Sequence, residues 1–175
     1  MFGDFSVGQI LNKSKTQTRR VITDKHRKGE DLNDVGGAAR VLHRCPYGQR
    51  GDRLWIRERW GVSTLYDALP PREINSGAAV GYSVHKPKGL KMRPAMYMPR
   101  WASRINLEVT ALSIDRLQNI SLDDMRGEGA GMLTERGTAQ AFRNLWNEVN
   151  GKRGYGWDEN PWVYCVGFKR VIHQL

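Results

Sequence analysis

The sequence predicts an α+β protein, built as a small mixed β-barrel with helices packed at its openings. Strand-like segments outnumber helical ones, and the connections between them are irregular. A doubly wound sheet would instead alternate strands and helices regularly along the chain. With 175 residues and no internal repeat, the chain is long enough for a sizeable core. We therefore expect a single domain over residues 1–175.

Three stretches carry the strand signal. Residues 53–60 alternate their side chains with the two-residue period of a strand, and we place this strand at the centre of the sheet. Residues 105–117 form the clearest long strand, and residues 162–172 close the chain as a mostly apolar one. Residues 78–84 are a weaker candidate, and a proline restricts residues 96–101 to an extended edge or a turn.

Helical signals are fewer than strand signals. A very short N-terminal helix is expected, with Ser6 and Gln9 forming a capping box. A stronger helix begins at Thr138, which caps it, and ends at Asn150-Gly151. Its apolar positions recur at helical spacing and comprise Phe142, Leu145, Trp146 and Val149.

Two polar segments interrupt this pattern, near residues 23–48 and near residues 61–93. The first contains glycine and is rich in lysine and arginine. Loops of this length inside a compact domain are usually functional or disordered. We expect both segments to be insertions in the domain and the first to be a long, mobile excursion.

The chain is strongly basic, with a formal charge of +10 and a sequence pI near 9.9. Neutralising phosphates gives affinity whatever the base sequence, so this charge indicates a polyanionic partner. Charge alone does not distinguish RNA from DNA or from a nucleotide. A basic surface that serves only solubility is the alternative.

Other partners are not indicated. No apolar run approaches the roughly 20 residues that span a bilayer, and the N-terminus lacks the features of a signal peptide. We expect a cytoplasmic protein with no membrane partner. Cys45 and Cys165 lie far apart and are expected to stay reduced. No second ligand pair accompanies His43 and Cys45, so we expect no metal site, and nothing indicates a cofactor or an oligomeric state.

The densest cluster of reactive side chains lies at residues 15–20, Lys-Thr-Gln-Thr-Arg-Arg. Two hydroxyls and three cations at one turn can bind a phosphate or hold a lysine at a lowered pKa. Beside two arginines, Lys15 loses its proton more easily, which would let it activate the Thr18 hydroxyl or a water. The alternative is a solvated basic turn in which both residues contact only phosphate, or nothing.

Glu128 is a second candidate, because it lies at the end of a helix that Ser121 caps. This helix is expected to stop near Gly127 or Gly129, where glycine allows close backbone approach or a positive φ. The helix dipole disfavours a carboxylate there, so its pKa would rise toward the range of a general acid or base. The alternative is an ordinary solvated glutamate before a helix cap.

A third group combines arginine with aromatic side chains. Arg100, Trp101 and Arg104 precede the long strand, and this interleaving suits base stacking and phosphate binding. Trp60 would add a stacking face, although most tryptophans are core residues. Glu58 shares the otherwise apolar side of its strand, where a carboxylate needs a partner or a raised pKa.

Five motifs, taken in order, resemble the ASCH domain, a PUA-like fold. They are LNKSKTQTRR, GDRLWIRERW, MPRWASRINLEVT, MRGEGAG and NPWVYCVGFKRV. They cover most of the chain outside the two insertions and are similar to the longer ASCH proteins common in phages and prophages. The resemblance implies a PUA-like small mixed β-barrel with flanking helices and a cleft that binds RNA or nucleotides. A phage-encoded member would act in the cytoplasm of its bacterial host.

The resemblance also implies an activity. Some short ASCH proteins are amidohydrolases that remove the acyl group from N4-acetylcytidine and related nucleosides, using a lysine, a threonine and a glutamate. By motif, these residues are Lys15, Thr18 and Glu128 here. We therefore expect a hydrolase acting on the exocyclic amide of N4-acylated cytidine, with Arg20 or backbone N–H groups stabilising the oxyanion. This chain is much longer than the short amidohydrolases and has Met125 where alanine is common.

The expected cleft also contains side chains that would bind the nucleoside or RNA. They are Glu58, Trp60, Arg100, Trp101 and Arg104, of which the first two belong to the strand placed at the sheet centre. Other ASCH members are ribonucleases or plain RNA binders. The alternatives are therefore a non-catalytic nucleic-acid-binding module and a ribonuclease that acts on single-stranded RNA.

Overall fold

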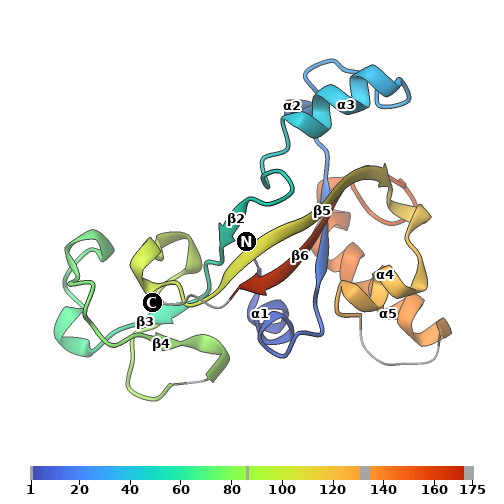
Figure 1. The fold of residues 1–175 in the computed structure, drawn as a ribbon. Helices are drawn as coiled ribbons and strands as arrows, with labels where there is room; N and C mark the ends of the chain where they lie inside the picture. The colour runs from blue at the N-terminus through green and yellow to red at the C-terminus, as the bar shows by residue number, and fades with distance from the viewer. Residues whose placement is uncertain (1, 86, 131–134, 172–175) are drawn as a thin grey trace.

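A four-stranded antiparallel sheet forms the centre of the molecule in this computed structural model, which describes residues 2–85, 87–130 and 135–171 (Figure 1). The strands lie in the order β1-β6-β5-β2, with bounds Gln17–Val21, Trp162–Val171, Asn106–Arg116 and Arg53–Trp55. The edge strands β1 and β2 are not paired with each other, yet residues of both line one cavity. The sheet is therefore a curled half-barrel with an open seam between its edges. This confirms the expected α+β class.

The two long strands β5 and β6 form the centre of the sheet. They pair antiparallel from Asn106 opposite Val171 to Arg116 opposite Trp162, with a register shift between Val109 and Ala111. Such a bulge increases the local twist of a sheet. Both strands were expected from their apolar pattern, with one end of the second prediction, Ile172, outside the described residues.

Three helices flank the sheet: α1, α4 and α5, with bounds Asp4–Leu11, Leu122–Gly127 and Glu135–Asn150. The expected start of α4 is confirmed, since the Ser121 hydroxyl accepts a hydrogen bond from the Asp124 N–H at 3.1 Å. Two expected starts are wrong. Gly3, not Ser6, precedes α1, and Thr138 lies inside α5 rather than at its cap.

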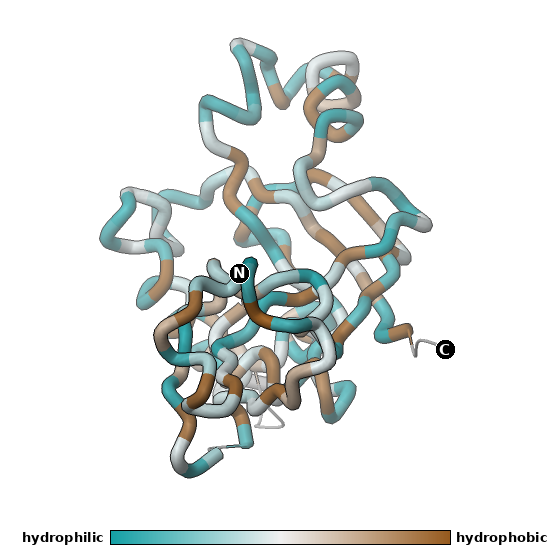
Figure 2. Tube along the Cα trace, turned by 90° about the vertical axis from the view of Figure 1, so that its left-hand side faces the viewer, coloured by the Kyte–Doolittle hydropathy of each residue, from teal (hydrophilic) through white to brown (hydrophobic). Residues whose placement is uncertain are grey.

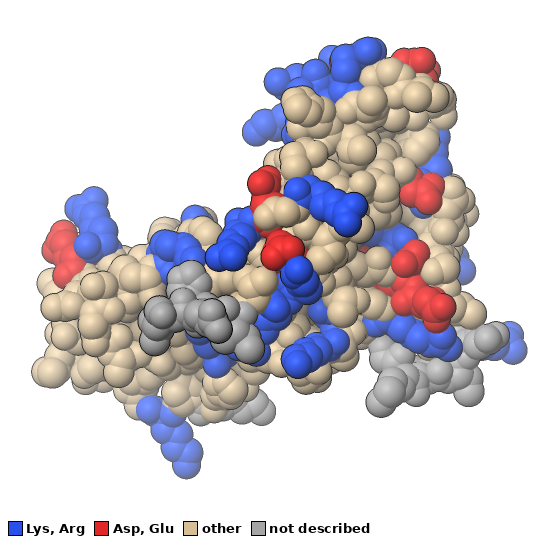
Figure 3. Space-filling model, viewed as in Figure 1, with Lys and Arg blue, Asp and Glu red and all other residues tan. Residues whose placement is uncertain are grey.

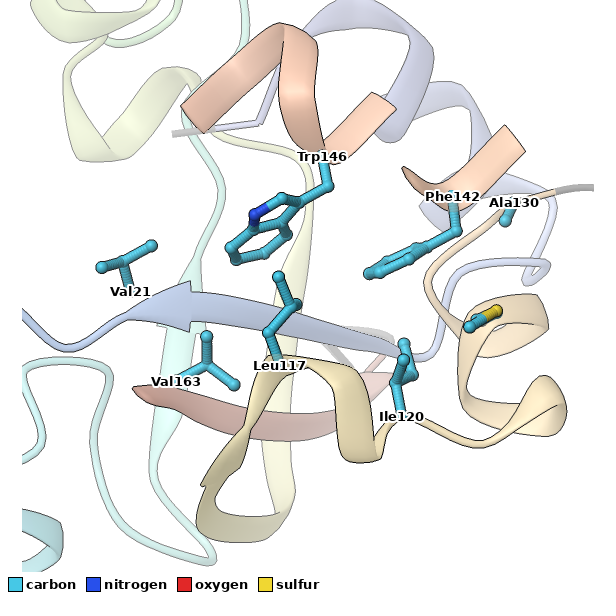
Figure 4. Close-up of a cluster of buried hydrophobic side chains, with 8 residues drawn as sticks. Val21, Leu117, Ile120, Ala130, Phe142, Trp146 and Val163 are labelled. Carbon is cyan, nitrogen blue, oxygen red and sulfur yellow. The ribbon is translucent and has the colours of Figure 1, made fainter. Parts of the chain in front are cut away.

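Helix α5 covers one face of the sheet (Figure 4). Its Phe142 and Trp146 pack with Val21, Val163 and Leu117. Burial of these apolar groups fixes the helix beside edge strand β1. Val149, expected on the buried side of this helix, is 56% exposed instead.

The opposite face is covered at two places. Near one end, Val41 packs with Tyr164 and Val166 of β6. Near the other, α1 places Val7 and Ile10 against a group that includes Ile105, Leu107 and Phe168. Figure 2 shows apolar and polar residues interspersed along the chain. Between the region packed by Val41 and the region packed by α1, this face of the sheet borders the cavity at the seam.

The segment near residues 23–48 is not the irregular excursion that its composition predicts. It forms helices α2 (Asp24–Arg27) and α3 (Val35–His43), which make an arm at one side of the molecule (Figure 1). The Asp34 carboxylate caps α3 by accepting from the Gly37 N–H at 2.7 Å. Glu30 ties the arm together through ion pairs with two of its arginines.

The single strand expected over residues 53–60 is also wrong. The chain forms β2 and then, after residues 56–59, a separate strand β3 (Trp60–Gly61) that pairs with β4 (Gly81–Tyr82). Strand β2 is an edge strand, not the central one.

Short 3-10 turns complete the chain. They span Thr64–Tyr66, Pro71–Glu73, Ser83–His85, Ala95–Tyr97, Arg100–Ala102, Leu117–Asn119 and Gly151–Arg153. Two of them fall on residues 96–101, where an extended edge or a turn was expected, and so confirm the turn. Within the described parts of the chain, no helix is both long and apolar enough to span a membrane.

Candidate functional site

A cavity of about 260 Å³ lies beside edge strand β1, between this strand and α5. Side chains from both faces of β1 reach it, because no strand among the described residues pairs with the outer edge of β1. Four residues of the basic hexamer line it: Lys15, Thr18, Arg19 and Arg20. Glu128 lines it as well, so the sequence candidates for chemistry share one cavity.

Lys15 and Glu128 form a buried ion pair at this cavity. The Lys15 Nζ lies 2.7 Å from the Glu128 Oε2 and also donates to the Glu128 backbone carbonyl. Only 6% of Lys15 and 7% of Glu128 is exposed. A lysine and a carboxylate this close can exchange a proton directly.

A turn after α1 brings Lys15 to this position. The backbone N–H groups of Ser14 and Lys15 both donate to the Gln9 carbonyl, at 2.9 and 3.1 Å. The next N–H, of Thr16, donates to the Gly127 carbonyl at 2.8 Å. The hexamer is therefore attached to the end of α1 on one side and to the end of α4 on the other.

Two glycines bring Glu128 to the same place, and both behave as expected. Gly129 has φ +87°, a left-handed conformation that favours glycine, and its carbonyl accepts from the Gln9 side-chain amide. A Cβ at Gly127 would meet the Gln17 amide at 3.0 Å. The end of α4 therefore approaches α1 and β1 closely enough for Glu128 to reach Lys15.

Burial lowers the pKa of Lys15, because desolvation disfavours the ammonium form. Glu128 acts in the opposite direction, through its charge and its hydrogen bond. The positive charges of Arg20 and Arg19 lower the pKa further. The net effect is a lowered Lys15 pKa, as expected from its position beside Arg19 and Arg20 in the sequence.

Arg19 is a site residue to which the sequence assigned no role. Its Nη2 lies 3.0 Å from the Asp124 Oδ2, and its Nη1 lies 3.9 Å from the Glu128 Oε1. Hydrogen bonds from Gln17 and Arg19 keep the pKa of Asp124 low, outweighing partial burial, which would raise it. Within the described ranges, the Arg19 Nε and Nη1 and the Glu128 Oε1 have no hydrogen-bond partner.

Strand alternation could have found Arg19. In β1, Thr18 and Arg20 lie opposite Val166 and Tyr164, whereas Arg19 lies opposite Cys165. Successive side chains of a strand point to opposite faces, so Arg19 faces α4 while Thr18 and Arg20 face the seam. An arginine on the covered side of a strand needs an acidic partner, and Asp124 supplies it.

The structure does not bring the other five expected residues to this cavity. Four of them, Glu58, Trp60, Trp101 and Arg104, lie in and beside the β3–β4 region. The fifth, Arg100, lies over the Trp55 ring of β2, at 5.7 Å from its centroid. The expectation that Glu58 and Trp60 line the cleft of Lys15 is corrected, because their segment leaves the sheet after β2.

Glu58 instead forms a buried ion pair. It is 1% exposed and binds Arg104 through two hydrogen bonds of 2.9 Å each. Trp60 is fully buried and packs edge-to-face on Trp101 at 6.0 Å. Arg100 donates to the Asn106 side chain at 2.6 Å. Nucleic-acid binding by the exposed parts of this group stays a prediction.

Comparison with known proteins gives one kind of match. No family model and no curated protein matches the sequence. The chain is similar to an ASCH domain structure. That structure, from Lactobacillus crispatus JV V101, has a TM-score of 0.47 and 15% identity, and the match covers 96% of this chain and 71% of that one. Protein EF3133 from Enterococcus faecalis V583 has a TM-score of 0.49 and 13% identity, covering 98% and 74%.

Proposed function

We propose that the protein is an ASCH-type hydrolase that cleaves the exocyclic amide of an N4-acylated cytidine. The observation that carries this proposal is the buried Lys15–Glu128 pair, in which the lysine has a lowered pKa, in a cavity that Thr18 also lines. Amide hydrolysis needs an activated nucleophile, a proton for the leaving amine and stabilisation of the oxyanion. The cavity offers one group for each need.

The nucleophile is the Thr18 hydroxyl, or a water beside it. Neutral Lys15 accepts the proton of this nucleophile as its oxygen attacks the acyl carbon. The carbonyl oxygen becomes the oxyanion of a tetrahedral intermediate, and Arg20 stabilises it from the same face of β1 as Thr18.

The leaving group is the N4 amine of cytosine. Lys15 passes its proton across the 2.7 Å contact to Glu128, which delivers it to N4 as the C–N bond breaks. Attack by water yields the carboxylic acid directly, whereas attack by Thr18 yields an ester that a water then hydrolyses. Arg19 is a positioning residue here, since it lies between Asp124 and the Glu128 carboxylate.

The direct test is incubation of the purified protein with N4-acetylcytidine. Release of cytidine and acetate is expected, and Lys15→Met and Glu128→Gln should each lower kcat/KM by at least about 100-fold, as loss of a general acid or base does. Arg72→Gln is the control, because Arg72 is exposed and remote from the cavity lining. Absence of turnover across a panel of N4-acylated cytidines would overturn the proposal.

Nucleic-acid binding without chemistry is the second candidate function, and the net charge of +10 favours it. Binding that requires several phosphates weakens steeply as salt rises. Salt-sensitive RNA binding with no turnover of any acylated cytidine would favour this function. Cleavage of labelled single-stranded RNA that depends on Lys15 would instead indicate a ribonuclease.

A further inference from the structure

We propose that the open seam of the half-barrel binds the nucleotide next to the one held beside Lys15. The substrate would then be a single-stranded polynucleotide that contains the modified cytidine, rather than the free nucleoside. This inference deepens the proposed function and rests on it for the identity of the reacting nucleotide. The seam itself is argued from its own side chains.

The seam is a cavity of about 490 Å³ between the two edge strands of the sheet. Strand β1 contributes Thr18 and Arg20, and β2 contributes Arg53 and Trp55. Its volume lies within the roughly 300–1,000 Å³ that is typical of small-ligand sites. The seam therefore has room for a base with its sugar.

The seam and the Lys15 cavity are continuous. Four residues line both of them: Phe2, Thr18, Arg20 and Tyr47. A nucleoside beside Lys15 would therefore direct one end of its sugar past Thr18 and Arg20 into the seam. A chain of two linked nucleotides fits this arrangement with a phosphate near Arg20.

Charge identifies the class of ligand. Among the described residues, the seam lining contains Arg20, Arg53 and Arg57 and no carboxylate. In the part of the chain that the structure describes, no ion pair involves any of these three, whereas two arginines of the α2–α3 arm are paired with Glu30. Figure 3 shows basic side chains across the middle of the face where β2 and β5 lie. Guanidinium groups with no acidic partner around one cavity favour a phosphate-bearing ligand. Arg57 donates one hydrogen bond, to the Met96 carbonyl at 3.2 Å.

Aromatic and apolar groups supply the surface for a base. Trp55 and Tyr47 are half-buried at the seam, over a floor formed by Leu107, Val166 and Phe168. The Arg57 guanidinium stacks on the Trp55 ring at 4.6 Å. Aromatic rings that carry arginine are typical of single-strand binding, in which bases stack while guanidinium groups hold the backbone.

The binding test uses an unmodified, fluorescently labelled single-stranded RNA tetranucleotide, measured by anisotropy at several salt concentrations. The double variant Arg53→Gln, Arg57→Gln should weaken binding by at least about tenfold. The slope of log K against log salt concentration should become shallower by about 0.7 for each phosphate contact that is lost. Trp55→Leu should weaken binding about tenfold. Arg72→Gln, an exposed arginine away from the seam, is the matched control and should change neither quantity. The same oligomer made of DNA distinguishes the two polynucleotides.

The catalytic test compares N4-acetylcytidine as the free nucleoside and at an internal position of a trinucleotide. The wild type should have the higher kcat/KM on the trinucleotide, and the Arg53→Gln, Arg57→Gln double variant should lower this preference at least tenfold. Arginine-dependent RNA binding without turnover would refute the hydrolase and support the seam. Equal kcat/KM on the nucleoside and the trinucleotide would refute the seam as a nucleotide site. So would RNA binding that changes by the same amount in the double variant and in Arg72→Gln.

Discussion

At the scale of single residues, the central feature is a lysine and a glutamate, 113 positions apart, buried together at one cavity. Burying an ion pair costs desolvation that a surface pair would not pay. Within the described residues, the Arg19 Nε and Nη1 and the Glu128 Oε1 make no hydrogen bond, which adds to this cost. Such costs are typical of functional sites, where perturbed groups gather for chemistry.

The lowered pKa of Lys15 predicts how activity depends on pH. The neutral amine is the base, so kcat/KM on N4-acetylcytidine should rise with pH through the lowered pKa and level off before 10.5, the ordinary value. Lys15→Arg should abolish the rising limb, because arginine stays protonated. The measurement is kcat/KM between about pH 5 and pH 10.

Arg19→Gln tests whether the charge of Arg19 sets the pH at which activity rises. The positive charge of Arg19 helps to lower the Lys15 pKa, so its removal should move the limb to higher pH. The matched control is Arg143→Gln on the surface of α5, where Arg143 pairs with Asp158. A limb that stays in place in Arg19→Gln but is lost in Lys15→Arg would mean that Arg19 does not tune the lysine.

The Lys15 pKa also has a consequence for stability. The unfolded chain holds the Lys15 proton up to about pH 10.5, whereas the folded protein releases it earlier. Between the lowered pKa and 10.5 the unfolded state binds more protons, so the contribution of Lys15 to the free energy of unfolding increases with pH there. Below that window, the contribution is constant.

At the scale of elements, the short helix α4 positions the carboxylate by the way it ends. Gly129 takes a left-handed conformation, and a Cβ there would meet the Gln9 side chain. Gly154 has a similar φ of +78°, but a Cβ at Gly154 would meet no atom of the described residues within 4 Å. The two glycines thus separate the cost of the conformation from the cost of the contact.

Gly129→Ala should therefore destabilise the protein more than Gly154→Ala. The left-handed conformation alone costs a residue with a Cβ about 1–2 kcal/mol. At Gly129 the new Cβ would also displace the end of the Gln9 side chain, which would then lose its hydrogen bond to the Gly129 carbonyl. The free energy of unfolding is measured by denaturant titration. Gly129→Ala should also lower kcat, because Glu128 shifts with the helix end. Equal losses of stability in the two variants would show that the contact with Gln9 does not matter.

Elements with a complete local signal were predictable from sequence. The alternating pattern of β5 and β6, and the serine cap of α4, each specify one structure. Residues 53–60 have the same alternation, but β2 ends at Trp55, and the partner of Glu58 is Arg104, 46 positions away, which the local pattern cannot reveal. Helix α3 was not predicted, because it contains two glycines, which have low helix propensity, although Asp34 caps it.

At the scale of the whole molecule, the site depends on a sheet that does not close. The edge strand β1 exposes both of its faces to one continuous space, the Lys15 cavity on one side and the seam on the other. The motif order predicted that Lys15, Thr18 and Glu128 would meet. It did not predict the separation of the Glu58 group, because that separation follows from where strand β2 ends.

This separation predicts that Glu58 stabilises the fold and takes no part in catalysis. Glu58→Gln leaves Arg104 with a neutral partner, and the Glu58 side chain is only 1% exposed. Loss of one member of a buried ion pair costs about 3 kcal/mol. The free energy of unfolding should fall accordingly, while kcat on N4-acetylcytidine stays within about twofold of wild type once the protein is folded. Adding Arg104→Gln removes the unpaired charge, so the double variant should lose less than the sum of the two single losses. A large drop in kcat with little loss of stability would instead return Glu58 to the catalytic cleft.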